Sequence, residues 1–277
     1  MPPLSNQLVR YMERGVHMVE AQRAKVVFVT GSTRGIGLAI ALKLAARGCA
    51  VAINGREKSD GLSQALEAVR REGGNAIAIA ADMSQPECHR PVLDQIEDEL
   101  GALDSVVCNA GVGPLRRSDI LEVGTDSFDH CIAANARGPF FLAQEFARRL
   151  VGTEERDHHR SLIFISSANA EAASLNKAEY CVSKAAVAMV AKTYAAKLSP
   201  MGVQVVDVRP GIIETQLSAP VIGEYERRIR EEGLTLSPRV GQPDDVARAV
   251  AAIVAGELPY VTGTVLSIDG GLSMARL

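Results

Sequence analysis

Short runs of consecutive apolar residues alternate along this chain with longer segments in which apolar residues recur every three or four positions. Uninterrupted apolar runs are typical of strands buried in a parallel sheet, and the longer segments are typical of helices that cover it. This alternation predicts an α/β fold with a doubly wound parallel sheet of about seven strands and helices on both faces. The expected strands lie at 26–29, 50–53, 76–80, 106–108, 162–165, 203–208 and 264–268, and the expected helices at 35–47, 62–71, 86–100, 128–150, 178–198 and 243–255.

The chain shows no internal break after its first residues. No Pro/Gly/Ser-rich linker, repeat or charge block divides residues 25–277, which are therefore expected to form one domain. Residues 1–24 mix charges with loosely helix-spaced apolar positions, and we expect a helical or disordered N-terminal extension rather than a signal peptide. The segment at about 216–239 is rich in both charge signs. It is expected to form a lid over a substrate, with a solvated helix face carrying i,i+4 ion pairs.

A glycine-rich segment joins the first expected strand to the first expected helix. Gly31 suits a tight turn, while Gly35 and Gly37 would let the backbone approach a pyrophosphate whose charge the helix N-terminus favours. Three glycines alone are a weak signal, but their position between a strand and a helix is the one that dinucleotide binding requires. The fold is therefore expected to be of the Rossmann type.

The end of the second strand indicates which dinucleotide is bound. NAD binders tend to place a carboxylate there to accept from the ribose hydroxyls, but this chain has Asn54, Gly55 and Arg56. Arg34 and Arg56 could supply guanidinium groups to a 2′-phosphate, which favours NADP(H) over NAD(H). The alternative is that Arg56 merely faces solvent. Asp82, after the third strand, is either an adenine contact or a turn residue.

Tyr180 and Lys184 are four residues apart within an expected helix, with Ser167 thirteen residues before the tyrosine. This spacing places the two side chains on one face, with Cβ atoms about 5–6 Å apart. A cation near the phenol favours the phenolate, so the proton is expected to leave more easily near neutral pH. Together with a dinucleotide site, the pair predicts proton and hydride chemistry on a carbonyl or alcohol.

In combination, these features resemble the short-chain dehydrogenase/reductase family, over about residues 25–271. The family acts on CH–OH donors with NAD(P), so the resemblance implies an enzyme of that class. The matching pieces, in family order, are TGSTRGIG at 30–37, Asp82, NAG at 109–111, Asn135, Ser167, YCVSK at 180–184, PG at 210–211, Thr215, and TG and DGG within 262–271.

The resemblance also implies roles for single residues. Tyr180 would be the general acid in carbonyl reduction and the base in alcohol oxidation, and Lys184 would bind the nicotinamide ribose and lower the tyrosine pKa. Ser167, preferred to Ser166 by its spacing, would hydrogen-bond the substrate oxygen. Asn135 would hold a water that relays protons to the lysine. The expected cofactor contacts are Gly31, Arg34, Gly35, Ile36, Gly37, Arg56, Asp82, Met83, Asn109, Gly111, Tyr180, Lys184, Ile213 and Thr215.

The segment SPRVGQPDDV at 237–246 is similar to one common in bacterial 3-oxoacyl-[acyl-carrier-protein] reductases. The leading expectation is therefore NADPH-dependent reduction of a carbonyl, with a 3-oxoacyl thioester as the most specific guess and an acyl-carrier protein as a possible partner. A carrier protein is acidic and needs a basic docking patch. Arg148, Arg149, Arg156 and Arg160 are candidates for that patch, although neighbouring acids dilute their charge.

Other functions stay open at this point. A sugar, polyol or other secondary-alcohol dehydrogenase shares the same motifs, and a non-catalytic NADP-binding sensor could share the fold. The complete set of Asn135, Ser167, Tyr180 and Lys184 weighs against the sensor. A nucleotide-sugar epimerase is disfavoured by the short chain and by the glycine spacing.

Net charge and residue composition exclude several other classes of protein. A net charge of −3 and a pI of about 6.0 give no basic footprint for nucleic acid. No apolar run is long enough for a membrane span. The five scattered cysteines lack a CxxC pair and suggest reduced thiols in a cytoplasmic protein. The five histidines lack the spacing of metal ligands, so no catalytic metal is predicted.

Family resemblance suggests a homotetramer built through helices 126–150 and 178–198 and the last strand.

Overall fold

A computed structural model describes residues 23–151 and 158–275 of the chain. The N-terminal extension expected at 1–24 therefore lies almost wholly outside the described residues. Among the residues described, no helix combines the length and apolar character needed to cross a membrane.

In the described part of the chain, seven parallel strands form one sheet in the order β3-β2-β1-β4-β5-β6-β7. The chain leaves β1 in one direction to build β2 and β3, and in the other to build β4 to β7, so the order reverses between β1 and β4. In doubly wound sheets, ligands bind past the carboxyl ends of the strands at this reversal. The predicted fold class is confirmed. The strands are β1 (Val26–Val29), β2 (Ala50–Gly55), β3 (Ala76–Ala80), β4 (Leu103–Cys108), β5 (Arg160–Ile165), β6 (Val203–Pro210) and β7 (Thr264–Ile268).

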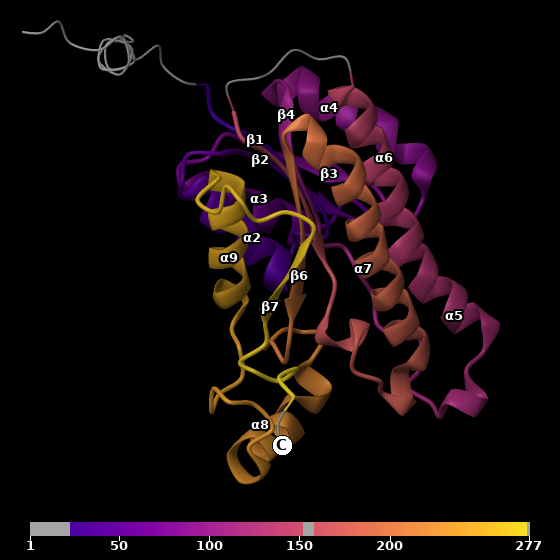
Figure 1. Ribbon diagram of the computed structural model, residues 1–277. Coiled ribbons are helices and arrows are strands. Elements are labelled where there is room, and N and C mark those ends of the chain that lie inside the picture. The colour runs from indigo at the N-terminus through magenta and orange to yellow at the C-terminus, as the bar shows by residue number, and fades with distance from the viewer. Residues whose placement is uncertain (1–22, 152–157, 276–277) are drawn as a thin grey trace, which may run out of the picture.

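Helices cover both faces of the sheet, as Figure 1 shows. Alternate residues of β1 point to opposite faces: Phe28 packs in the core with Leu142 and Val187, whereas Val29 packs with Ile40 and Val246. The first of these faces carries α4 (His89–Leu100), α6 (Gly138–Leu150) and α7 (Ala178–Leu198); the second carries α2 (Gly35–Ala45), α3 (Asp60–Arg71) and α9 (Pro243–Ala255).

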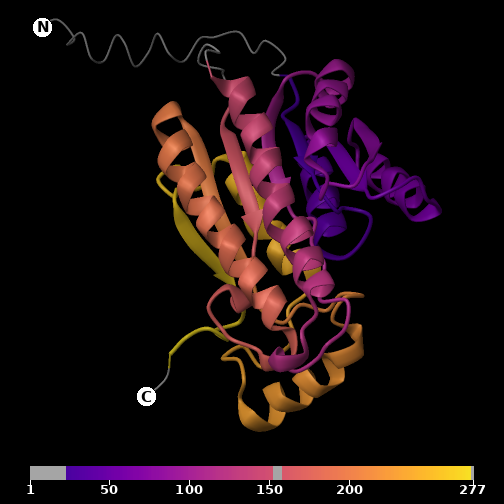
Figure 2. The same ribbon diagram turned by 90° about the vertical axis from the view of Figure 1, so that its right-hand side faces the viewer.

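Helix α8 (Ile222–Glu232) lies beyond the carboxyl ends of the strands, within the segment expected to be a lid (Figures 1 and 2). Its exposed face carries the expected i,i+4 pairs, Arg227 with Glu231 at 3.2 Å and Arg228 with Glu232 at 3.0 Å. Such exposed pairs contribute little stability, because water and salt screen their charges.

The single helix expected at 128–150 is interrupted. Helix α5 (Thr125–Ile132) leads into a π-helical turn, Ala133–Arg137, before α6 begins. Two local features account for this. Pro139 has no N–H to continue an α-helical ladder, and Gly138 lies so close to the Met83 carbonyl that a Cβ there would be 2.3 Å from its oxygen. Asn135 lies in this turn, and single π turns are common at functional sites.

Candidate active site

A pocket of about 860 Å³ opens where the strands end. Its walls come from the turn after β1, the end of β2 and the segments after β3, β4, β5 and β6, and α8 contributes to its outer side. Every residue that the sequence predicted for the site lines this pocket except Asn135, which is buried. Those lining it are Gly31, Arg34, Gly35, Ile36, Gly37, Arg56, Asp82, Met83, Asn109, Gly111, Ser167, Tyr180, Lys184, Ile213 and Thr215.

The glycine turn forms a cradle of bare backbone at the start of α2. Gly31 and Gly35 have φ of +61° and +57°, a region in which side chains are strained. A Cβ on Gly37 would lie 2.4 Å from the Asn109 amide nitrogen, which donates to the carbonyls of Thr30 at 2.9 Å and Gly31 at 3.0 Å. Asn109 thus holds the turn against the end of β4. Free N–H groups at a helix N-terminus with no acidic side chain nearby fit the pyrophosphate of a dinucleotide.

Asn54 has a role that the sequence did not reveal. It is buried, its Oδ1 accepts from the Gly31 N–H at 3.1 Å, and its Nδ2 donates to the Ala81 carbonyl at 2.9 Å. It therefore joins the glycine turn to the end of β3. The side chain that stands in place of the usual acid is therefore engaged with backbone groups of these loops.

Two arginines lie at the adenosine end of the pocket. Arg56 is exposed, with its Nε 3.9 Å from an Asp82 carboxylate oxygen, and Arg34 donates to the Gln216 side chain at 2.9 Å. Asp82 itself accepts from the Ser84 N–H at 3.0 Å, which is a turn contact. Both guanidinium groups line the pocket, and neither is committed to a buried ion pair.

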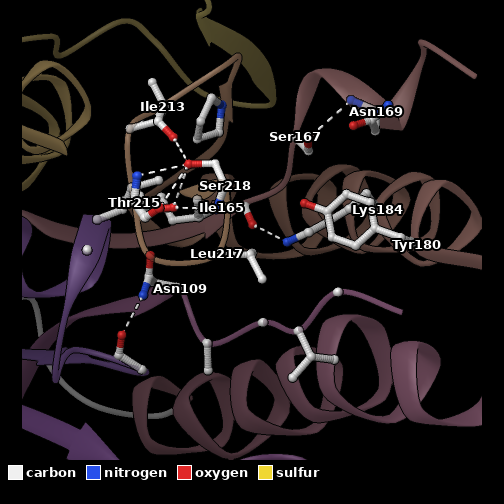
Figure 3. A pocket seen from close by; sticks show the side chains of 18 of the residues that line it. Asn109, Ile165, Ser167, Asn169, Tyr180, Lys184, Ile213, Thr215, Leu217 and Ser218 are labelled. Atoms are coloured by element: carbon white, nitrogen blue, oxygen red, sulfur yellow. Dashed lines mark hydrogen bonds between the residues drawn. The ribbon is translucent and has the colours of Figure 1, made fainter. Parts of the chain in front are cut away.

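Ser167, Tyr180 and Lys184 converge on one side of the pocket, as Figure 3 shows. A hydrogen bond from Ser167 favours the ionised phenol of Tyr180, and Ser167 Oγ also accepts from the Asn169 N–H at 3.1 Å. The buried Lys184 ammonium donates to the Ile165 carbonyl at 3.0 Å and lies 5.7 Å from the centroid of the Tyr180 ring. Ser166 instead donates to Asp207.

The ionisation of this pair differs from the expectation. Burial raises the pKa of Tyr180 to about 12, and the opposing effects of Ser167 and the Arg117 charge do not overcome it. Burial also lowers the pKa of Lys184 to about 8, against the raising effect of Asp207. The sequence predicted a lowered tyrosine pKa from the nearby cation alone, because burial cannot be read from spacing. Without cofactor, Tyr180 therefore keeps its proton at neutral pH.

Asn135 lies beneath the pocket rather than in its wall. Its amide pairs with Val112, accepting from the N–H at 2.8 Å and donating to the carbonyl at 3.0 Å, and it also donates to Ser183 Oγ at 2.9 Å. A Cβ on Gly111 would be 3.0 Å from Asn135 Oδ1 and 3.4 Å from Lys184 Nζ, so both groups border the same small space.

A buried charge network below the site was missed by the sequence. Asp207 accepts from Ser166 and from Arg209 Nε, the latter at 2.8 Å, and Arg209 also pairs with the exposed carboxylate of Glu171. Asp207 and Arg209 are almost fully buried in β6. Two charges within a mostly apolar strand were the available signal, since buried charges are rarely tolerated unpaired.

The basic docking patch expected for a carrier protein is not formed by the proposed residues. Arg160 is buried in β5, and Arg149 is paired with Asp94 at 2.6 Å and Glu97 at 2.7 Å. Arg148 pairs with Glu145, whose carboxylate offsets the arginine charge. Arg156 lies outside the described residues.

The fold and this pocket define a nicotinamide-dependent oxidoreductase class, and comparison with known proteins agrees. A family model described as Enoyl-(Acyl carrier protein) reductase matches residues 31–273. The chain is 32% identical to 3beta-hydroxysteroid dehydrogenase 1 of Eggerthella lenta, over 93% of this chain and 97% of that protein. It is 30% identical to L-rhamnose 1-dehydrogenase (NAD(P)(+)) of Azotobacter vinelandii, over 90% of this chain and 96% of that one.

Among solved structures, a 3-oxoacyl-[acyl-carrier protein] reductase from Brucella melitensis in complex with NAD superimposes with a TM-score of 0.88. It is 33% identical, and the match covers 93% of this chain and 100% of that one. The chain belongs to the short-chain dehydrogenase/reductase family, as the resemblance predicted. It is an oxidoreductase of the kind that acts on CH–OH donors with NAD(P).

Proposed function

We propose that this protein reduces a carbonyl to a secondary alcohol with NADPH, and that Tyr180 is the general acid. The observation that carries this proposal is the placement of the half-buried Tyr180 beside Ser167 in the dinucleotide pocket, where partial burial raises the pKa of its hydroxyl to about 12 and keeps it protonated at neutral pH. A bound reduced nicotinamide would supply hydride to the carbonyl carbon. Tyr180 gives its proton to the carbonyl oxygen, and Ser167 donates a hydrogen bond to that oxygen as its charge grows.

The other two residues of the set support this transfer. The Lys184 ammonium is held by the Ile165 carbonyl close to the phenol, where its charge stabilises the phenolate that remains after proton donation. Asn135 holds the loop at Val112 and borders the space next to Lys184, where a water could return a proton to the pair. Cofactor would be held by the glycine cradle, Asp82 with Met83 at the adenine, and Ile213 with Thr215 at the carboxamide.

The identity of the carbonyl substrate is supported less directly, because the similar proteins act on different compounds. A 3-oxoacyl thioester is supported by the Brucella neighbour, and a sugar or other secondary alcohol by the rhamnose dehydrogenase. The test is to follow NADPH absorbance with a panel of ketones, oxo acids, sugars and acetoacetyl thioesters. Tight NADPH binding without turnover of any of them would favour a cofactor sensor over an enzyme.

Preference for NADPH over NADH is proposed to rest on Arg56 and Arg34. Arg56→Ala is expected to raise the KM for NADPH about 10- to 100-fold, the effect of losing a hydrogen bond to a charged group, and to leave the KM for NADH nearly unchanged. Steady-state kinetics with both cofactors measure this. Lys58→Ala, which removes a nearby cation outside the pocket lining, is the matched control. If the wild type uses NADH at least as well as NADPH in kcat/KM, the preference is wrong.

We also propose that the protein is a cytoplasmic homotetramer. All five cysteines are free thiols, which suits a reducing compartment. Apolar side chains are exposed on the helices expected at the interface, including Phe140 and Phe141 of α6 and Val182 and Met189 of α7. Exposed apolar residues gathered on neighbouring helices are typical of association surfaces. Light scattering on the purified protein measures its mass, and a stable monomer would contradict this assembly.

A further inference from the structure

The pocket has an uneven charge distribution. Among the described residues, the acidic ones in its lining are Glu57 and Asp82, which follow β2 and β3 at the proposed adenosine end. Around Tyr180 the lining contains the cations Lys177 and Arg117. Helix α8 contributes a further cation, Arg228, to the lining. Arg228 is already paired with Glu232 at 3.0 Å, and the charge of Lys184, which also lines the pocket beside Tyr180, interacts with that of Asp207. The uncompensated charge next to the reacting group therefore belongs to Lys177 and Arg117.

Lys177 is placed by the same elements that build the catalytic group. It immediately precedes α7, one helical turn before Tyr180, and its ammonium lies 5.5 Å from the centroid of the Tyr180 ring. Its Nζ donates to Asn169 Oδ1 at 2.8 Å, and the backbone N–H of Asn169 donates to Ser167 Oγ at 3.1 Å. The cation is therefore tied to the segment that carries the serine, and it lies beside the Tyr180 ring.

No carboxylate balances these two cations within the described part of the chain. Burial lowers the pKa of Lys177, and the repulsive charge of Arg117 lowers it further. The Arg117 charge also reaches Tyr180. Two adjacent cations, one of them half-buried, are unfavourable in the free protein and are offset when an anion binds between them. A pocket lined in this way selects for negative charge in its ligand.

We propose that the substrate carries a carboxylate close to its carbonyl or alcohol carbon, and that Lys177 and Arg117 bind this carboxylate. The inference rests on the proposed function and narrows the substrate to a short oxo acid or hydroxy acid. The position of Lys177 beside Tyr180 requires the anion to be only a few bonds from the reacting carbon. In a carrier-protein thioester the nearest fixed charge is the phosphate at the far end of the pantetheine arm, which does not meet this requirement.

The test uses matched pairs of neutral and anionic carbonyls with the full-length protein: 2-oxo, 3-oxo and 4-oxo acids, each with its methyl ester, and acetoacetyl-carrier protein. At least one acid is expected to exceed its ester in kcat/KM by 10-fold or more. Lys177→Met and Arg117→Gln should each lower the kcat/KM for that acid about 10- to 100-fold and leave both the ester and the KM for NADPH nearly unchanged. Arg116→Gln, which removes the neighbouring exposed cation outside the pocket lining, is expected to behave as wild type.

Three results would overturn the inference: esters used as well as acids, equal loss of acid and ester in Lys177→Met, or a clear preference for the carrier-protein thioester. If no carbonyl compound is reduced, the proposed function is wrong, but the anion site is still open to a separate test.

That test is calorimetry of the same acids with NADPH-saturated protein at low salt, which measures whether an anion binds at Lys177 and Arg117. Binding that disappears in Lys177→Met supports it, and absence of binding rejects it. Thermal unfolding of each variant shows whether it is folded.

Discussion

Replacing Tyr180 with phenylalanine is expected to lower the kcat of carbonyl reduction by about 100- to 10,000-fold, the usual contribution of a positioned general acid. The substitution removes the hydroxyl that is hydrogen-bonded to Ser167 and keeps the ring that lies near the Lys177 and Lys184 ammonium groups. Packing should therefore survive while proton donation is lost. The measurement is the rate of NADPH oxidation at saturating substrate, with NADPH affinity determined in parallel by fluorescence.

Tyr225→Phe is the matched control for this experiment. Tyr225 also lines the pocket, but it belongs to α8 on the outer side. Loss of its hydroxyl is expected to change kcat less than about 10-fold, because it lies outside the group formed by Ser167 and Lys184. A Tyr180→Phe enzyme that turns over at the wild-type rate would refute the assignment of the general acid.

Much of the fold could be predicted because short-range patterns of apolar residues and glycines indicate its helices, strands and turns. The buried strands appear as continuous apolar runs, and the glycine turn at Gly31 and Gly37 lies between a strand and a helix where the dinucleotide motif requires it. Element ends were less accurate. Strand β6 continues through Arg209 and Pro210, past the last apolar residue of the run, because its backbone still pairs with β7.

The candidate site was predictable only where its residues form local motifs. Tyr180 and Lys184 share a helix face, so their proximity follows from spacing. The contact of Ser166 with Asp207 joins residues 41 positions apart, and that of Asn54 with Gly31 joins residues 23 apart. Such contacts depend on strand order. The direction of the Tyr180 pKa depends on burial, which also arises only when distant elements pack together.

Substituting Asp207 with asparagine is expected to lower the free energy of unfolding by about 3–5 kcal/mol. Asp207 is buried, and its negative charge is the main partner of the equally buried Arg209 guanidinium, which donates to it at 2.8 Å. The variant would leave that cation with only the exposed Glu171 as a charged partner. Urea unfolding measures the change. Glu171→Gln, which removes the exposed member of the same network, is expected to cost less than about 1 kcal/mol.

The same variant should shift the pH dependence of catalysis. The Lys184 pKa is lowered to about 8 by burial and is held from falling further by the Asp207 charge, so the ammonium is present below that pH and is lost as the pH rises through it. Since a neutral lysine no longer stabilises the phenolate, kcat/KM for reduction should decline on the alkaline side of pH 8 in the wild type. Without the Asp207 charge the ammonium is less stable, and the decline should begin at a lower pH. An Asp207→Asn enzyme that is folded and keeps the wild-type pH profile would show that Asp207 stabilises the fold without tuning the lysine.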